Sequence, residues 1–141
     1  MIFERKKYLD ELIAGRGNGL VKIITGVRRC GKSFLLFDIW HNWLLEHGVD
    51  DSHIIEIQLD DFRNRRLRKP DALLDYIDSK VADDGNPYYI VLDEVQLVEE
   101  FVEVILSLTH MRNVDVYVSG SNSRFLRVRD RKSGSAGMPR P

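Results

Sequence analysis

A strand-like apolar run that leads directly into a turn rich in glycine and cations constrains this chain more than any other feature. Residues 21–36 read VKIITGVRRCGKSFLL, with β-branched residues first and a helix-like apolar pattern last. Three cations so close together repel one another unless an anion lies between them. The turn contains the pattern G-x-x-x-x-G-K-[ST], whose fixed positions are Gly26, Gly31, Lys32 and Ser33. In this pattern backbone N–H groups surround phosphate oxygens at a helix N-terminus, so we expect the anion to be a nucleoside triphosphate.

Individual residues of this loop have expected roles. Lys32 reaches the β- and γ-phosphates and counts as catalytic, and the Ser33 hydroxyl binds Mg²⁺. Arg28 or Arg29 contacts phosphate oxygens or an acidic neighbour, or both are solvated loop residues. Cys30 lies where a helix N-terminus lowers a thiol pKa, although we favour a small buried residue over a reactive one. The expected nucleotide-binding set is Gly26, Val27, Arg28, Arg29, Cys30, Gly31, Lys32, Ser33 and Phe34.

Polar residues follow two other strand-like runs. YYIVLDEVQ places Asp93 and Glu94 after an apolar strand, and the carboxyl edge of a parallel sheet is where ligands bind. Asp93 is expected to hold Mg²⁺ and Glu94 to activate the attacking water as a general base. Gln96 positions water or relays the nucleotide state, or is a surface amide. In VYVSGSNS, Asn122 is the candidate contact to the γ-phosphate or lytic water and Ser121 the reserve, against a plain turn.

Strands and helices alternate along residues 1–126. Strands are expected at 20–25, 53–59, 88–92 and 114–118, and helices at 4–14, 33–48, 71–81 and 98–111. This alternation predicts a three-layer α/β/α fold with a parallel sheet covered on both faces. Together with the G-x-x-x-x-G-K-[ST] pattern, it indicates a P-loop NTPase. Residues 127–141 have few apolar residues and no periodicity, so they are expected to be a disordered or non-native tail.

Composition excludes several other classes. The formal net charge is -1, so no global field draws the chain onto nucleic acid or membrane. A single cysteine excludes an internal disulfide, no apolar run approaches the roughly 20 residues of a membrane span, and the N-terminus lacks a secretory pattern. We therefore expect a cytoplasmic location. The four histidines show no zinc-ligand spacing.

One charged run keeps a nucleic-acid partner open. The segment Arg63–Lys69 carries five cations, which could contact nucleic-acid phosphates. It follows two aspartates and lacks the interleaved aromatic residues of a stacking platform. We favour a solvated loop.

Together these motifs resemble the AAA-type ATPase superfamily of the additional-strand P-loop class. More narrowly, they resemble a bacterial and archaeal group of predicted ATPases whose N-terminal core precedes a C-terminal domain of unknown function. The resemblance rests on RKKYLDEL, ITGVRRCGKSFLL, YIVLDEVQ and VSGSNSRFL, within residues 1–126. It implies a sheet in the order 5-1-4-3-2, with Asp93 and Glu94 after strand 3 and Asn122 in the sensor position after strand 4. It also implies ATP rather than GTP, and no N-K-x-D guanine-reading element follows a strand.

The C-terminus departs from the family pattern. The family would continue into a helix, a Gly-Arg element, a fifth strand and a second domain, whereas this chain continues as RVRDRKSGSAGMPRP. We hypothesise a truncated or frameshifted product that lacks strand 5. Back-translation of residues 127–132, read one nucleotide later, allows Val-Ser-Glu-Ile-Ala after Leu126, which looks like the family's continuation.

The leading functional expectation is Mg²⁺-dependent ATP binding and hydrolysis, coupled to a partner domain or subunit. The alternative is a nucleotide-binding switch module without appreciable turnover, which the missing Gly-Arg element favours. A small-molecule kinase is a third reading, and the adjacent Asp93 and Glu94 argue against it.

Overall fold

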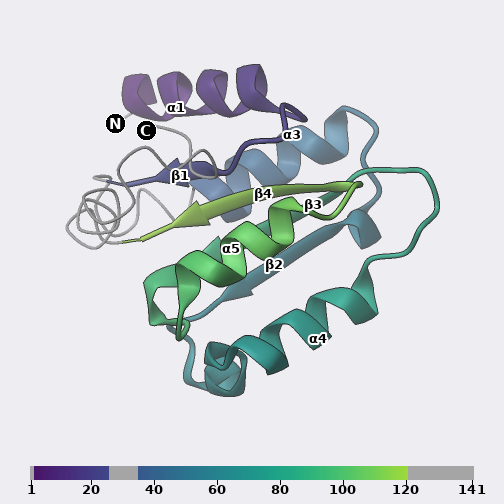
Figure 1. The fold of residues 1–141 in the computed structure, drawn as a ribbon. Helices are drawn as coiled ribbons and strands as arrows, with labels where there is room; N and C mark the ends of the chain where they lie inside the picture. Colours follow the sequence, from purple (N-terminus) through teal and green to yellow (C-terminus); the bar gives the residue numbers. More distant parts are fainter. Residues whose placement is uncertain (1, 26–34, 121–141) are drawn as a thin grey trace.

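A four-stranded parallel sheet forms the centre of the molecule in a computed structural model that describes residues 2–25 and 35–120 (Figure 1). The strands are β1 (Lys22–Ile24), β2 (Ile54–Gln58), β3 (Tyr88–Asp93) and β4 (Val114–Ser119). Their spatial order is β1-β4-β3-β2, and every neighbouring pair is parallel. This confirms the predicted α/β class, and the order agrees with the 1-4-3-2 part of the expected sheet.

Helices cover both faces of this sheet (Figure 1). The helices are α1 (Ile2–Gly15), the π-helical η1 (Leu35–Trp40), α3 (His41–Glu46), α4 (Pro70–Lys80) and α5 (Phe101–Thr109). Three short 3₁₀-helical turns are η2 (Asp51–His53), η3 (Phe62–Arg68) and η4 (Val95–Leu97). Apolar side chains of α1, η1 and α3 pack on one face, and those of α4 and α5 pack on the other. The three predicted layers are therefore present.

The strand β3 shows why the sheet needs two helical layers. All six of its residues are buried. Ile90 and Leu92 belong to the core shared with α4 and α5, whereas Tyr89 and Val91 belong to the core shared with α1, η1 and α3. Alternate residues of a strand point to opposite faces, so a continuous apolar run is stable only where both faces are covered.

Several predicted elements are shorter in the structure, and two of them show why. Strand pairing in β1 begins only at Lys22, because the side chain of Asn18 accepts a hydrogen bond from the Leu20 N–H (2.9 Å) and the Lys22 ammonium binds the Leu20 carbonyl (2.8 Å). The helix expected at 98–111 begins at Phe101, because Glu100 adopts the left-handed conformation with φ 52°. Both corrections are local turns that hydrophobic periodicity does not reveal.

Candidate functional site

The carboxyl ends of β1, β4 and β3 lie side by side. Ile24 is paired with Ser119 and Leu92 with Val118, and the Gly120 N–H donates to the Ile24 carbonyl at 3.3 Å. The chain therefore leaves β1 toward the glycine-rich loop beside the end of β4, one strand away from the end of β3. This is the edge of a parallel sheet where ligands bind.

Ser119 joins the ends of β3 and β4. Its side chain is fully buried, and its hydroxyl donates a hydrogen bond to Oδ1 of Asp93, which is only 2% exposed. The same Oγ accepts a hydrogen bond from the Glu94 N–H at 3.0 Å. One hydroxyl therefore fixes both predicted acidic residues relative to β4.

Glu94 leaves the strand through an unusual backbone conformation. Its φ of 57° and ψ of 51° are left-handed, a region that non-glycine residues seldom occupy outside constrained sites. The chain turns sharply here into η4, so the Glu94 carboxylate is half-buried at the sheet edge instead of continuing the strand. Asp93 and Glu94 are adjacent in sequence but occupy different environments, which suits different roles.

Gln96 contacts the candidate base directly. Its Nε2 donates to Oε1 of Glu94 at 2.8 Å. Its own Oε1 is buried and has no hydrogen-bond partner among the residues that the structure describes. A buried amide oxygen without a donor is uncommon in a folded protein. Gln96 therefore contacts Glu94 and is only partly exposed, and its role in positioning water or relaying the nucleotide state stays a prediction.

The Asp93 carboxylate has the chemistry that suits a Mg²⁺ ion bound together with phosphate. Mg²⁺ is typically held by one or two carboxylates, a hydroxyl and phosphate oxygens rather than by a cage of protein ligands. Residues 2–25 and 35–120 contain no cluster of three or more His, Cys, Asp or Glu side chains suited to a metal. Asp93 offers a nearly buried carboxylate at the sheet edge.

Other predicted site residues lie outside the described residues. These are Gly26, Val27, Arg28, Arg29, Cys30, Gly31, Lys32, Ser33 and Phe34 of the loop, and Ser121 and Asn122 after β4. The structure does place the two chain segments that lead to them, Thr25 and Gly120, next to one another through the β1–β4 pairing.

Sequence reasoning missed Ser119. The segment VYVSGSNS predicts small polar residues at the carboxyl edge of the sheet, and Ser119 lies there. The predicted contacts to the nucleotide, Asn122 and Ser121, follow the strand. The available signal was the position of Ser119 as the last strand residue, with Tyr117 and Val118 before it. Which of three serines faces Asp93 depends on the register between β3 and β4.

Comparison with known proteins identifies the family. A family model described as an AAA domain matches residues 18–137, and the chain belongs to this family. An uncharacterized protein of Haemophilus influenzae (strain ATCC 51907 / DSM 11121 / KW20 / Rd) is 28% identical over 125 residues, which cover 89% of this chain and 31% of the relative. The chain thus spans about a third of the length of that relative. No solved structure matches the chain significantly.

The family and the sheet topology together define a nucleotide-binding AAA-type ATPase fold. Within the described ranges, no helix combines the length and hydropathy that a transmembrane span requires.

Proposed function

We propose that this chain binds Mg-ATP and hydrolyses it to ADP and phosphate. The observation that carries the proposal is the Asp93–Ser119–Glu94 arrangement at the carboxyl edge, beside the point where β1 leads into the G-x-x-x-x-G-K-[ST] loop. A carboxylate for the metal, a second carboxylate and a phosphate-binding loop on neighbouring strand ends are the parts that phosphoryl transfer to water requires.

Each part has a proposed task. Lys32 and the loop N–H groups bind the phosphates, and Ser33 and Asp93 hold Mg²⁺, which when bound neutralises charge on the β- and γ-phosphate oxygens. Glu94 accepts a proton from the attacking water as the bond between the γ-phosphorus and the bridging oxygen breaks and ADP leaves. Asn122, or Ser121 in its place, contacts the γ-phosphate.

Gln96 and Ser119 act through Glu94 in this proposal. The hydrogen bond from Gln96 to one oxygen of the Glu94 carboxylate orients this group. The Ser119 contact to the Glu94 N–H fixes the backbone of the base. Both are positioning residues, because neither needs to touch the nucleotide.

The test is steady-state phosphate release from Mg-ATP by the full chain, with Glu94→Gln alongside. General-base catalysis contributes about 10²- to 10⁴-fold, so we expect the variant to lose turnover by that factor while it still binds ATP. Glu46→Gln, which makes the same charge change at an exposed site in α3, is the matched control. Equal turnover in the wild-type chain and Glu94→Gln would contradict the role of Glu94.

A second candidate is a nucleotide-binding switch that does not turn over alone. It is favoured by one observation, that the chain spans only 31% of its Haemophilus influenzae relative, so groups that complete the site could belong to the rest of such a protein or to a partner. Saturable binding of a fluorescent ATP analogue without phosphate release would support this candidate over the first.

A further inference from the structure

The turn η3, which follows β2, is a fixed element and not a loose loop. Leu67 is buried in the core, and its neighbours tie the turn to the sheet. The Asn64 side-chain amide donates to the Gln58 carbonyl at 2.9 Å, and Nε of Arg68 donates to the Leu59 carbonyl at 2.8 Å. The segment expected as a solvated loop does expose most of its side chains, but its backbone forms a 3₁₀-helical turn anchored to the core.

An exposed aromatic residue begins this turn. Phe62 is 68% exposed, more than any other large apolar residue that the structure describes. The Arg65 guanidinium carbon lies 4.1 Å from the Phe62 ring centroid, and Arg65 also donates a hydrogen bond to the Phe62 carbonyl at 3.0 Å. The sequence pattern does not predict Phe62 as a stacking residue, because Phe62 precedes the charged run Arg63–Lys69 and does not alternate with its cations.

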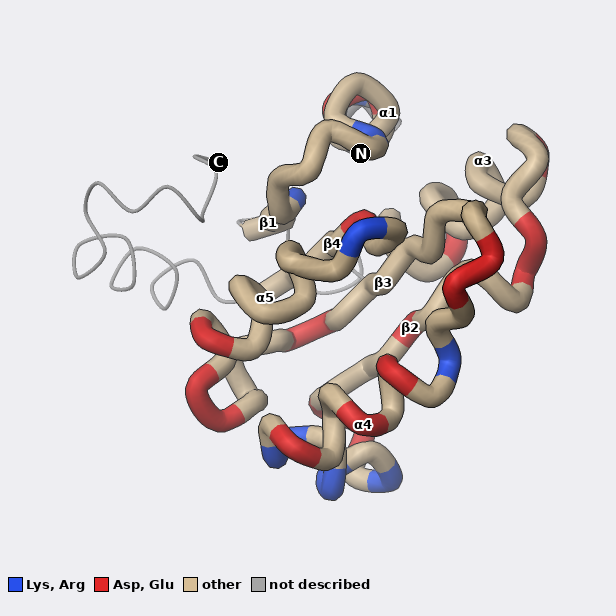
Figure 2. The backbone as a smooth tube through the Cα atoms, turned by 45° about the vertical axis from the view of Figure 1, so that its right-hand side comes forward, with Lys and Arg blue, Asp and Glu red and all other residues tan. Residues whose placement is uncertain are grey.

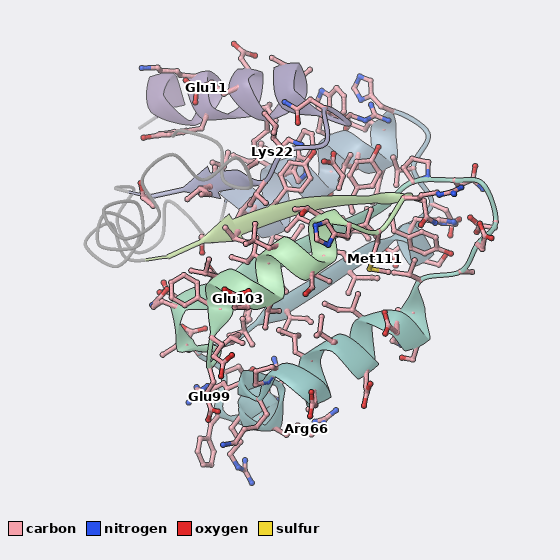
Figure 3. The ribbon with its side chains drawn as sticks, viewed as in Figure 1. Glu11, Lys22, Arg66, Glu99, Glu103 and Met111 are labelled. Atoms are coloured by element: carbon pink, nitrogen blue, oxygen red, sulfur yellow. The ribbon has the colours of Figure 1, made fainter. Side chains whose placement is uncertain are left out.

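The turn carries more cationic side chains than its ion pairs with acidic residues neutralise. Arg63 is paired with Asp61 at 3.1 Å, and Lys69 with Glu99 at 2.6 Å. Arg65 and Arg66 are exposed and have no ion pair within the described residues. Figure 2 shows the lysines and arginines gathered around the start of α4, and Figure 3 shows Arg66 at the outer surface there.

We define the η3 surface as Phe62, Arg63, Arg65 and Arg66. We propose that it binds single-stranded nucleic acid, with a base stacked on the Phe62 ring and the arginines on backbone phosphates. Sequence-tolerant binding of single strands combines these two interactions. A duplex is the poorer fit, because η3 is a short turn and not a helix or ribbon that enters a groove. An acidic peptide would use the arginines but would give the exposed ring no base to stack on.

Backbone contacts tie the two ends of the η3 segment to the end of β3 and to the chain that precedes α5. The Leu59 N–H donates to the Asp93 carbonyl at 3.1 Å, and the Glu99 N–H donates to the Arg68 carbonyl at 2.9 Å. The segment that leads into η3 thus contacts the backbone of Asp93, and the proposed oligonucleotide binding does not depend on ATP hydrolysis.

The experiment is fluorescence anisotropy of the full chain with end-labelled oligo-dT and oligo-U of about 12 nucleotides, a length within single-strand site sizes. We expect saturable binding that weakens with salt, with a logarithmic slope of about 0.7 for each phosphate contacted. Phe62→Ala should weaken binding by roughly fivefold or more without changing that slope, because it removes stacking and no charge. Arg65→Gln with Arg66→Gln should lower the slope by about 1.4, the contribution of two phosphates.

Three controls separate this surface from other cations. Arg112→Gln removes one exposed arginine after α5, away from η3, and should leave affinity unchanged. Lys32→Ala should bind the oligonucleotide as tightly as the wild-type chain, and a loss of affinity would place the oligonucleotide at the phosphate loop and overturn the proposal. Thermal unfolding of each variant checks its fold, which the exposure of Phe62 predicts to be intact.

Several outcomes would overturn the proposal. These are no oligonucleotide binding at low salt, affinity that Phe62→Ala leaves unchanged, and a labelled duplex that binds as tightly as the single strands. Displacement of the oligonucleotide by polyglutamate at equal charge concentration would also overturn it, because the surface would then recognise charge alone and an acidic protein would be the better partner.

Discussion

At the scale of single residues, the candidate site depends on the buried hydroxyl of Ser119. It donates to Asp93 and accepts from the Glu94 N–H, so it determines where both carboxylates lie relative to β4. Its two partners are strong hydrogen-bonding groups at the edge of the core, and such groups are costly to leave without a partner.

We predict that Ser119→Ala loses both stability and hydrolysis. The substitution deletes the two hydrogen bonds that the Ser119 hydroxyl makes, one of them to a carboxylate, which should cost about 1–3 kcal/mol in the free energy of unfolding, measurable by urea denaturation. Phosphate release should fall more than ATP affinity, because the displaced group is the base and not the phosphate loop. Ser119→Thr, which keeps the hydroxyl, should restore most of both.

The control for this prediction is Ser107→Ala, an exposed serine of α5 whose removal should change stability by less than about 0.5 kcal/mol. Unchanged hydrolysis in Ser119→Ala would show that the hydroxyl is structural only.

At the scale of elements, β1 is attached to the sheet by a buried ion pair as well as by its backbone. The Lys22 ammonium and Oδ1 of Asp115 are 2.6 Å apart, with side chains 9% and 5% exposed. Oδ2 of Asp115 also accepts hydrogen bonds from the Tyr117 hydroxyl (2.6 Å) and the Gly17 N–H (2.9 Å). Burial, together with the neighbouring Asp115 carboxylate, raises the pKa of Tyr117, so this hydroxyl remains a donor. The short strand β1 is thereby held to β4 and to the turn after α1.

We predict that Asp115→Ala destabilises the fold by about 3 kcal/mol or more, because it leaves the Lys22 ammonium buried without its carboxylate. When Lys22 is already replaced in Lys22→Met, Asp115→Ala should lower the free energy of unfolding by less. The difference between the two losses is the interaction energy of Lys22 with Asp115. Urea denaturation of the four chains gives the values. Additive costs would mean that the ion pair contributes nothing. Asp78→Ala, at an exposed position of α4, is the matched control.

At the scale of the whole molecule, the proposed nucleotide site is built from segments far apart in the chain. The loop after β1, the end of β3 and the end of β4 meet only in the folded sheet. A ligand that binds this site binds the native state alone and must stabilise it.

We predict that Mg-ATP raises the unfolding midpoint of the chain. At 100 times its dissociation constant, it should add about 2.7 kcal/mol to the free energy of unfolding. Lys32→Ala should abolish the effect, and AMP, which lacks the β- and γ-phosphates, should not produce it. A midpoint insensitive to Mg-ATP in calorimetry would contradict nucleotide binding by this chain.

Local sequence patterns were enough to predict the alternation of strands and helices, the parallel sheet and the place of Asp93 and Glu94 at a strand end. These features follow from local patterns, because hydrophobic period and the spacing of glycines and polar residues are written in neighbouring positions. Three contacts follow only from the folded chain: Ser119 binds Asp93, Lys22 binds Asp115 across 93 positions of sequence, and Phe62 stacks with Arg65 on a fixed turn. The first two contacts depend on the register of β4 against its neighbours, and a shift of one residue would turn each side chain to the other face of the sheet. The third depends on the anchoring of η3 by Leu67 and Arg68, which the core provides.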